Sequence, residues 1–264
     1  MASITTPVSR SVCDGDRDFV GLCDMPLRAG AGDGGRTAVR LSVIVPMLNE
    51  EGAIGATLDA IRVSAPRAQI IVVDGGSTDR SIEVASNRGA EILRARRGRA
   101  CQMNAGAAAA HGDALAFVHA DTMVPTTFAA DVAAGLADPN VVGGRFDLEL
   151  DESSWTWRLL GKLISWRSRM MRSATGDQAI FVRRAIFVAM GGFAEIDLCE
   201  DIDFARRLKH RGRVACLRSQ VITSARRWRQ RGLFRTVLKM WLIKSLFLAG
   251  VSPTRLRRYY ADIR

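Results

Sequence analysis

The chain is poor in cysteine, and the cysteines it has are scattered. Five occur among 264 residues, and no two stand at a spacing typical of metal ligands. Dispersed cysteines in an odd number do not provide the regular pairs of a disulfide-stabilised domain. We therefore predict free thiols, as expected for a protein of the reducing cytoplasm.

The chain also lacks a long uninterrupted apolar run. The best candidate, residues 233–251, is broken by Arg235, Lys239 and Lys244, whereas a membrane-spanning helix needs about 20 apolar residues. Residues 1–40 mix Gly, Asp, Arg and Ser without an apolar segment, so no secretory signal is predicted. We interpret residues 1–40 as a disordered N-terminal extension, or in part as a start assigned too early.

Acidic residues are almost absent from the C-terminal part of the chain. Residues 204–264 hold 17 Lys or Arg and one acid, Asp262, whereas the net charge of the whole chain is +11. A basic end of this kind fits phosphate groups, nucleic acid or an anionic membrane, or it is simply a solvated face. Nucleic acid is disfavoured, because few aromatic residues interleave with the charges and no nucleic-acid-binding motif accompanies them.

Three short apolar runs in the first half of the chain end close to acidic residues. The runs occupy residues 41–45, 69–73 and 114–118, and the polar positions that follow them are Asn49, Glu50, Asp74 and Asp121. Such runs, alternating with helical patterns, are typical of parallel strands buried on both faces. We therefore predict an α/β fold with a Rossmann-like, mostly parallel sheet flanked by helices, and acids gathered at the carboxyl ends of its strands. Carboxylates there suit a ribose hydroxyl, a base edge or a divalent metal that carries a diphosphate.

The alternation of strands and helices changes after residue 141, but no linker or repeat divides residues 41–224. We predict a strand over 141–150, a Trp- and Arg-rich helix over 155–171, a helix over 201–210 and two short strands near 214–217 and 221–223. Ser77 or Thr78 is expected to cap the helix after the second strand, and Pro125 to start another helix. One domain over 41–224 is therefore expected, followed by a basic amphipathic helical tail over 225–264.

The loop after the first predicted strand disfavours two classes of nucleotide-binding enzyme. A dinucleotide dehydrogenase would place Gly-x-Gly-x-x-Gly there, and a nucleotidyltransferase would place a glycine-rich loop bearing arginine there. The chain instead has Pro46-Met47-Leu48-Asn49 at this position.

Six segments together resemble family 2 glycosyltransferases of the GT-A fold. They are Ser42-Val43-Ile44-Val45-Pro46 with Asn49-Glu50, Val72-Val73-Asp74-Gly75-Gly76-Ser77-Thr78-Asp79, Gln102-Met103-Asn104-Ala105-Gly106, His119-Ala120-Asp121-Thr122, Gly176-Asp177-Gln178 and Glu200-Asp201-Ile202-Asp203. They occur in the family's order, at family-like intervals, over residues 41–224. As a set the match is specific, whereas any one segment alone is weak.

The resemblance implies an inverting hexosyltransferase that moves a sugar from a nucleotide-diphosphate donor. Asn49 and Glu50 would lie at the nucleotide, with the backbone near Pro46 shaping the floor of the site. Asp74 would accept a hydrogen bond from the base edge. A UDP-sugar is favoured, and a GDP-sugar is the alternative.

The family match also implies a site for the donor phosphates. Asp121 would coordinate a divalent metal, Mg²⁺ or Mn²⁺, that bridges the phosphates. Arg99, in the loop before Asn104, is placed to hold phosphate, and Asn104 would lie near the donor. The family's metal motif usually reads Asp-x-Asp or Asp-Asp, whereas His119 takes the first position here. A histidine can ligate the metal or bond a ribose hydroxyl, or it can be an ordinary polar residue at a strand end.

Inverting transfer needs a general base for the acceptor hydroxyl, and the family match places it at Asp201. The acceptor side would be lined by Glu200 and by Gly176, Asp177 and Gln178, with the glycine allowing close backbone approach. Asp203 is expected to stabilise the helix N-terminus instead.

Two features of the tail bear on the kind of transfer. Arg227 and Trp228 faintly resemble the Arg-Trp motif that holds the donor diphosphate in processive family members, but the fuller Gln-x-x-Arg-Trp form is absent. Transfer of a single sugar is therefore favoured over polymerisation. Residues 232–253 also resemble a short bacterial subgroup associated with arsenosugar biosynthesis, which does not define the acceptor.

The apolar helix predicted over 233–249 leaves several alternatives open. It can bind an anionic membrane surface, pack on the domain, or form a homodimer. Membrane binding would favour a polyprenyl-phosphate or other lipid acceptor, and a peripheral place on the inner face of the cell membrane. A non-catalytic nucleotide- or membrane-binding protein is the alternative from another class, and the set of Asp74, Asp121 and Asp201 argues against it.

Overall fold

The structure, a computed structural model, describes residues 39–152, 154–170, 174–225 and 233–260. The strands are β1 (Leu41–Met47), β2 (Gln69–Asp74), β3 (Glu91–Arg94), β4 (Ala114–Phe117), β5 (Thr122–Met123), β6 (Val141–Leu150), β7 (Ile180–Arg183) and β8 (Arg213–Thr223). The helices are α1 (Ile54–Ser64), α2 (Ser81–Ser86), α3 (Arg99–Ala109), α4 (Phe128–Gly135), α5 (Trp155–Met170), the 3₁₀ helix η2 (Gly176–Gln178), α6 (Arg184–Ala189), α7 (Glu200–Lys209), α9 (Leu233–Leu248) and α10 (Pro253–Tyr260). The N-terminal extension expected over 1–40 lies almost wholly outside these residues.

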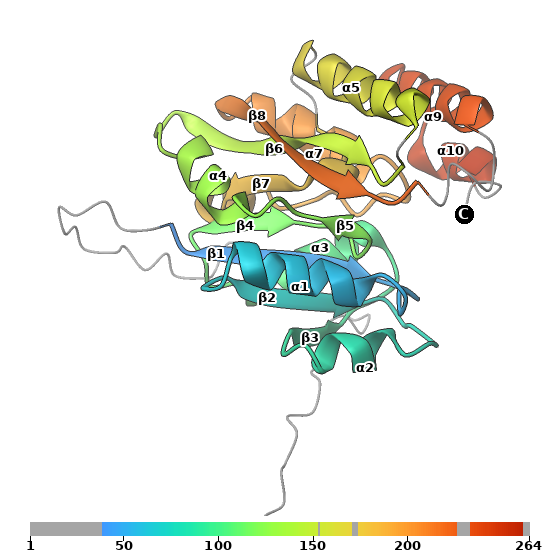
Figure 1. The fold of residues 1–264 in the computed structure, drawn as a ribbon. Coiled ribbons are helices and arrows are strands. Elements are labelled where there is room, and N and C mark those ends of the chain that lie inside the picture. The colour runs from blue at the N-terminus through green and yellow to red at the C-terminus, as the bar shows by residue number, and fades with distance from the viewer. Residues whose placement is uncertain (1–38, 153, 171–173, 226–232, 261–264) are drawn as a thin grey trace, which may run out of the picture.

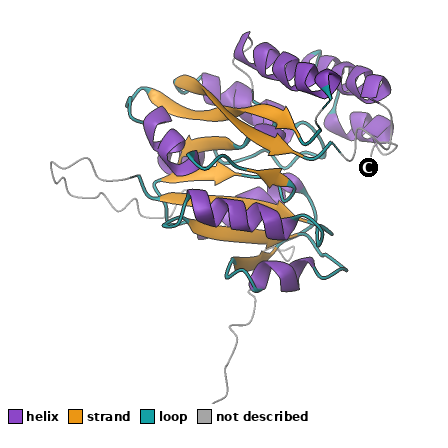
Figure 2. Cartoon of the chain, in the orientation of Figure 1, coloured by secondary structure: helices purple, strands orange, loops and turns teal. Residues whose placement is uncertain are grey.

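Within the described residues, eight strands form one sheet in the order β3-β2-β1-β4-β7-β6-β8-β5. The neighbours β3, β2, β1 and β4 are parallel to one another, and β6 is parallel to β8. Strand β7 is antiparallel to β4 and β6, and β5 is antiparallel to β8. Helices flank the sheet (Figures 1 and 2). The predicted α/β fold with a mostly parallel sheet is confirmed.

Each face of the sheet carries its own apolar core. Val43 and Val45 of β1 pack with Leu58 of α1 on one face, and Ile44 packs with Met103 of α3 on the other. All five side chains are buried. A strand covered on both faces needs a continuous apolar run, which is the pattern seen in the sequence.

The C-terminal helices pack against the start of α7 and against α5. Ile243 of α9 and Leu256 of α10 are buried in a small cluster with Cys199. Helices α5 and α9 lie side by side at one end of the molecule (Figure 1), and Arg167 of α5 stands over the ring of Trp241 of α9. In the part of the chain that the structure describes, no helix is long and apolar enough to cross a membrane.

The two short strands predicted near 214–217 and 221–223 are instead one strand, β8. It pairs with β6 along most of its length, and the register shifts between Arg145 and Asp147. The shift leaves room in β8 for extra polar residues. These polar residues interrupt the apolar pattern, which is why two separate strands were predicted.

Two helix starts also differ from the prediction. Helix α2 has no side-chain cap, and the Ser77 hydroxyl instead accepts the Asn49 N–H at 2.9 Å. Helix α4 begins at Phe128 rather than at Pro125, because a turn comes first, in which the Phe128 N–H donates to the Pro125 carbonyl at 2.9 Å.

Candidate active site

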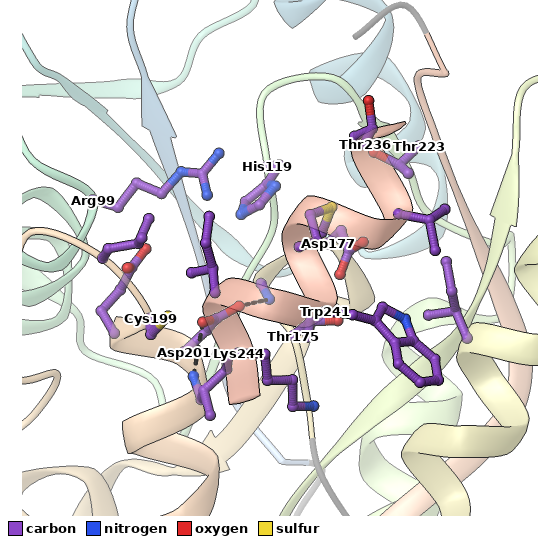
Figure 3. Close-up of a pocket in the computed structure, with 18 of the residues that line it drawn as sticks. Arg99, His119, Thr175, Asp177, Cys199, Asp201, Thr223, Thr236, Trp241 and Lys244 are labelled. Carbon is purple, nitrogen blue, oxygen red and sulfur yellow. Dashed lines mark hydrogen bonds between the residues drawn. The ribbon is translucent and has the colours of Figure 1, made fainter. Parts of the chain in front are cut away.

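A pocket of about 200 Å³ lies between the carboxyl ends of the sheet strands and the C-terminal helices. One side is formed by Arg99 at the start of α3 and by His119 and Asp121 between β4 and β5. The 3₁₀ helix η2 and residues 198–202 at the start of α7 form the floor, and α5 with α9 closes the other side (Figure 3). Seven predicted site residues line this pocket, namely Arg99, His119, Asp121, Gly176, Asp177, Glu200 and Asp201.

Asp201 lies in the first turn of α7, and backbone N–H groups hold both oxygens of its carboxylate. Oδ2 accepts the Gly176 N–H at 2.7 Å, and Oδ1 accepts the Ile202 N–H at 2.7 Å. The residue before the helix, Cys199, has a left-handed backbone with φ of 67°, which turns the chain sharply into α7. The helix N-terminus favours the negative charge of Asp201.

Gly176 allows the backbone of η2 to approach His119 and Asp201 closely. A Cβ atom at this position would lie 2.8 Å from His119 Nε2 and 3.6 Å from Asp201 Oδ2. The first distance is too short for a carbon contact. A glycine is therefore required for these three residues to meet in this arrangement.

Asp177 and Cys199, at the base of the pocket, have raised pKa values. Burial raises the pKa of Asp177, and the negative charge of Asp201 adds to this effect. Burial, with the charges of Asp201 and Glu200, raises the pKa of the Cys199 thiol to about 12. Because the thiolate is the nucleophile, a raised pKa makes the Cys199 thiol unreactive at neutral pH.

Asp121 and His119, the pair that the sequence motif predicts for a divalent metal, both line the pocket. Among the described residues, no group of three or more His, Cys, Asp or Glu side chains is arranged to hold a metal ion. Mg²⁺ in nucleotide sites is commonly held by one or two carboxylates, with substrate phosphates and water completing its shell. One carboxylate and one imidazole beside Arg99 therefore fit a metal that binds together with a diphosphate.

The residues predicted for the nucleotide lie at the carboxyl ends of β1 and β2, outside the lining of this pocket. Asp74 is 1% exposed, and its carboxylate accepts the N–H groups of Gly76 at 2.9 Å and Ser77 at 3.1 Å. Asn49, with φ of 53°, accepts the Thr78 N–H at 2.8 Å through Oδ1. Pro46 lies within β1 and Glu50 follows it, and β1 pairs with β4, the strand that precedes His119 and Asp121.

Two predicted residues, Asn104 and Gln178, make contacts of a structural kind, and two others lie outside the described residues. Asn104 donates to the Phe193 carbonyl and accepts the Phe193 N–H, both at 2.9 Å. Gln178 is fully buried and completes a capping box with Thr175, so it fixes the shape of η2 rather than lining the pocket. Arg227 and Trp228 belong to residues 226–232, which the structure does not describe.

Sequence reasoning missed the contribution of α5 and α9 to the pocket. Arg167, Trp241 and Lys244 line it and were not singled out as site residues. The sequence did indicate that Lys244 is unusual, because it is a lysine within the apolar face of a predicted helix. The sequence did not show which part of the molecule packs against that face.

The fold and the pocket define an α/β protein of the GT-A class. A mannosyltransferase of Pyrobaculum calidifontis, PcManGT, superimposes over 92% of this chain and 74% of its own, with a TM-score of 0.63 and 19% identity. Residues 1–349 of S. aureus TarS superimpose over 78% of this chain and 65% of that one, with a TM-score of 0.58 and 18% identity. At such identities the likeness shows the fold alone.

The chain belongs to glycosyl transferase family 2, whose family model matches residues 42–194. This confirms the resemblance seen in the sequence motifs. PGL/p-HBAD biosynthesis glycosyltransferases of Mycobacterium bovis and Mycobacterium tuberculosis are 29% identical over 168 residues, which is 59% of this chain and 64% of theirs. The chain therefore spans less than two thirds of the length of these curated relatives.

Proposed function

We propose that the protein is an inverting glycosyltransferase that moves one hexose from a nucleotide-diphosphate donor to an acceptor hydroxyl. The observation that carries this proposal is the position of Asp201. Its carboxylate lies in the pocket and is oriented by the N–H groups of Gly176 and Ile202. A carboxylate oxygen has two lone pairs, so each oxygen keeps one for an acceptor hydroxyl. Asp201 thus has the geometry of a general base.

In the proposed reaction, Asp201 takes the hydroxyl proton while the acceptor oxygen attacks the anomeric carbon. The bond from that carbon to the diphosphate oxygen breaks on the opposite face, so the configuration inverts. The leaving diphosphate gains negative charge, which Arg99 is placed to bind. When bound, a divalent metal at Asp121 and His119 would neutralise part of this charge.

Solved structures of the same fold support a nucleotide-sugar donor and a divalent metal. The PcManGT structure holds GDP-Man and Mn²⁺, and a structure of TarS 1–349 holds UDP-GlcNAc. For this chain we propose a UDP-sugar, with Mg²⁺ or Mn²⁺, as the sequence motifs imply. The base would lie near Asp74 and the strand-end loop of Asn49 and Glu50.

The first test is the variant Asp201→Asn, assayed with UDP-sugars and Mn²⁺ by release of UDP. Loss of a general base is expected to lower kcat by about 10²–10⁴-fold. The dissociation constant for UDP with Mn²⁺ should stay unchanged, because Asp201 is not placed to bind the donor phosphates. Asp203→Asn is the matched control, since Asp203 lies in the same helical turn and pairs with Arg207 at 2.7 Å. Full activity of Asp201→Asn would remove Asp201 as the base.

A lipid-linked acceptor is the second candidate, and an exposed apolar surface favours it. The α5–α9 face consists of Trp155, Leu159, Leu163, Trp166 and Met170 of α5 and of Leu238, Met240, Trp241, Leu242 and Leu248 of α9, all exposed. Trp241 belongs both to this face and to the pocket. Tryptophans on an apolar face within a basic part of the chain suit the interface of an anionic membrane. The acceptor would then be a polyprenyl phosphate or another lipid, and the protein would lie on the inner face of the cell membrane.

A further inference from the structure

Two cations in the pocket wall have buried nitrogen atoms without partners. The Nζ of Lys244, on α9, and the Nε of Arg167, on α5, are buried and make no hydrogen bond in the described part of the chain. Both residues line the pocket. Burial lowers the pKa of Lys244 and of Arg167, and the charge of Arg167 lowers the pKa of Lys244 further. The charge of Asp201 opposes the shift of Lys244, and the charge of Asp177 opposes the shift of Arg167.

Such an arrangement is unfavourable unless an anion lies beside the two cations. A buried charge without a hydrogen-bonded partner is destabilising, and two like charges near one another add to the penalty. Buried polar groups without partners are uncommon in folded proteins, and functional sites are one place where they persist. An anion that enters the pocket and contacts both cations would remove this penalty.

Lys244 lies on α9, on a different element from the residues proposed for the donor phosphates. In the view of Figure 3, Arg99 and His119 lie in the upper part of the pocket, Trp241 lies at the right, and Lys244 lies next to Asp201 below them. Lys244 is close enough to Asp201 for the two charges to affect each other. An anion bound there would therefore lie beside the proposed base, on the side from which the acceptor hydroxyl must come.

We propose that Lys244 and Arg167 form a subsite for an anionic group of the acceptor, a phosphate or a carboxylate near the reacting hydroxyl. The assignment to the acceptor rests on the proposed transferase function, whereas binding of an anion does not. Trp241 would help to hold Arg167, whose guanidinium carbon lies 5.8 Å from the centre of the indole ring. The subsite would select anionic acceptors over neutral ones.

The experiment measures thermal unfolding of the whole chain with inorganic phosphate, against chloride at equal ionic strength. At a phosphate concentration about ten times the dissociation constant, the Tm of the wild-type protein should rise by roughly 3 °C. Lys244→Met removes the charge and keeps most of the volume, so its Tm without phosphate should be equal to or higher than the wild-type value. Its Tm should rise clearly less with phosphate than that of the wild type, because only sites that both proteins share, such as Arg99, still bind phosphate. Lys162→Met, an exposed lysine of α5, is the control and should respond like the wild type. No phosphate response of the wild type, or an equal response of Lys244→Met, would overturn the subsite.

A second measurement decides which substrate supplies the anion. Titration of UDP with Mn²⁺ should give the same dissociation constant for Lys244→Met and the wild type, within about threefold. A loss of tenfold or more would assign the cations to the donor diphosphate and overturn the acceptor assignment. If the wild type bound no nucleoside diphosphate, the proposed function would fail, whereas the phosphate response would still report on the subsite.

Discussion

At the scale of single residues, Gly176 determines how closely η2 approaches His119. In Gly176→Ala the new Cβ would lie 2.8 Å from His119 Nε2, so the imidazole or the backbone must move. Small displacements of aligned groups reduce rates strongly, and we expect kcat to fall by about tenfold or more. The measurement is turnover with a UDP-sugar, together with Tm to show that the variant is folded.

Gly52→Ala provides the matched control for this prediction. A Cβ at Gly52 meets nothing within 4 Å, and the backbone there is not left-handed, so activity should be unchanged. Equal activity of both variants would show that the contact between η2 and His119 has no role in turnover.

The acids of the site were predictable from the sequence, and the cations of its far wall were not. Asp121 follows a strand-like run, and Asp201 begins a helix within a recognisable motif, so short-range patterns locate them. Lys244 and Arg167 become neighbours only when α9 packs beside α5. Asn104 similarly bonds to Phe193, 89 positions away along the chain, and no local pattern records such a contact.

At the scale of elements, an ion pair within β6 is bonded to α5. Arg145 is fully buried, and it donates to the Asp147 carboxylate at 2.6 Å and to the Ser165 carbonyl at 3.1 Å. Arg169 of α5 donates to the same carboxylate. Asp147 thus balances the charge of two arginines between the sheet and the helix that forms one side of the pocket.

We predict that Asp147→Asn lowers the free energy of unfolding by about 3–5 kcal/mol, because it leaves the buried Arg145 cation without its counter-charge. Urea unfolding measures this value. Asp113→Asn is the control, since its partner Arg40 has a side chain that is 70% exposed, and the expected change is below about 1 kcal/mol. Similar losses for both variants would show that burial of Arg145 does not strengthen the pair.

Strands were predicted best where burial of both faces of the sheet produces a continuous apolar run in the sequence. The runs that became β1, β2 and β4 are buried on both faces, so composition alone revealed them. Strand β7 lies antiparallel between β4 and β6, and no local pattern predicts this direction, because it depends on how the chain returns through α5. The bulge that keeps β8 continuous opposite Arg145 and Asp147 depends on pairing with β6, which is also non-local.

At the scale of the whole molecule, the two ends of the pocket come from different parts of the chain. The donor-side residues and Asp201 lie within residues 41–224, whereas α9 supplies Trp241 and Lys244. Helix α9 also carries exposed apolar side chains, and one of them, Trp241, contacts Arg167 of α5. The C-terminal helices therefore join the proposed acceptor side of the pocket to the α5–α9 face.

This arrangement makes membrane binding testable with the intact protein. We predict that it floats with vesicles of anionic phospholipid and not with neutral ones, and that about 0.5 M salt weakens binding because it screens the basic charges. Trp166→Ser and Leu242→Ser, each more than half exposed on the α5–α9 face, should reduce binding by about tenfold. Val63→Ser is the control, since Val63 is 75% exposed on α1.

Deletion of residues 233–264 tests whether the tail is needed for membrane binding but not for the fold of the sheet domain. The small cluster of Cys199, Ile243 and Leu256 is distinct from the two cores that pack on the sheet, so the sheet domain should remain folded by circular dichroism. The truncated protein should bind UDP with Mn²⁺ but not vesicles.

If the intact protein never binds vesicles and sediments as a dimer that Trp166→Ser disrupts, the face is a homodimer interface and the lipid acceptor loses its main support. Vesicle binding that survives both face variants would instead place the membrane contact elsewhere on the chain.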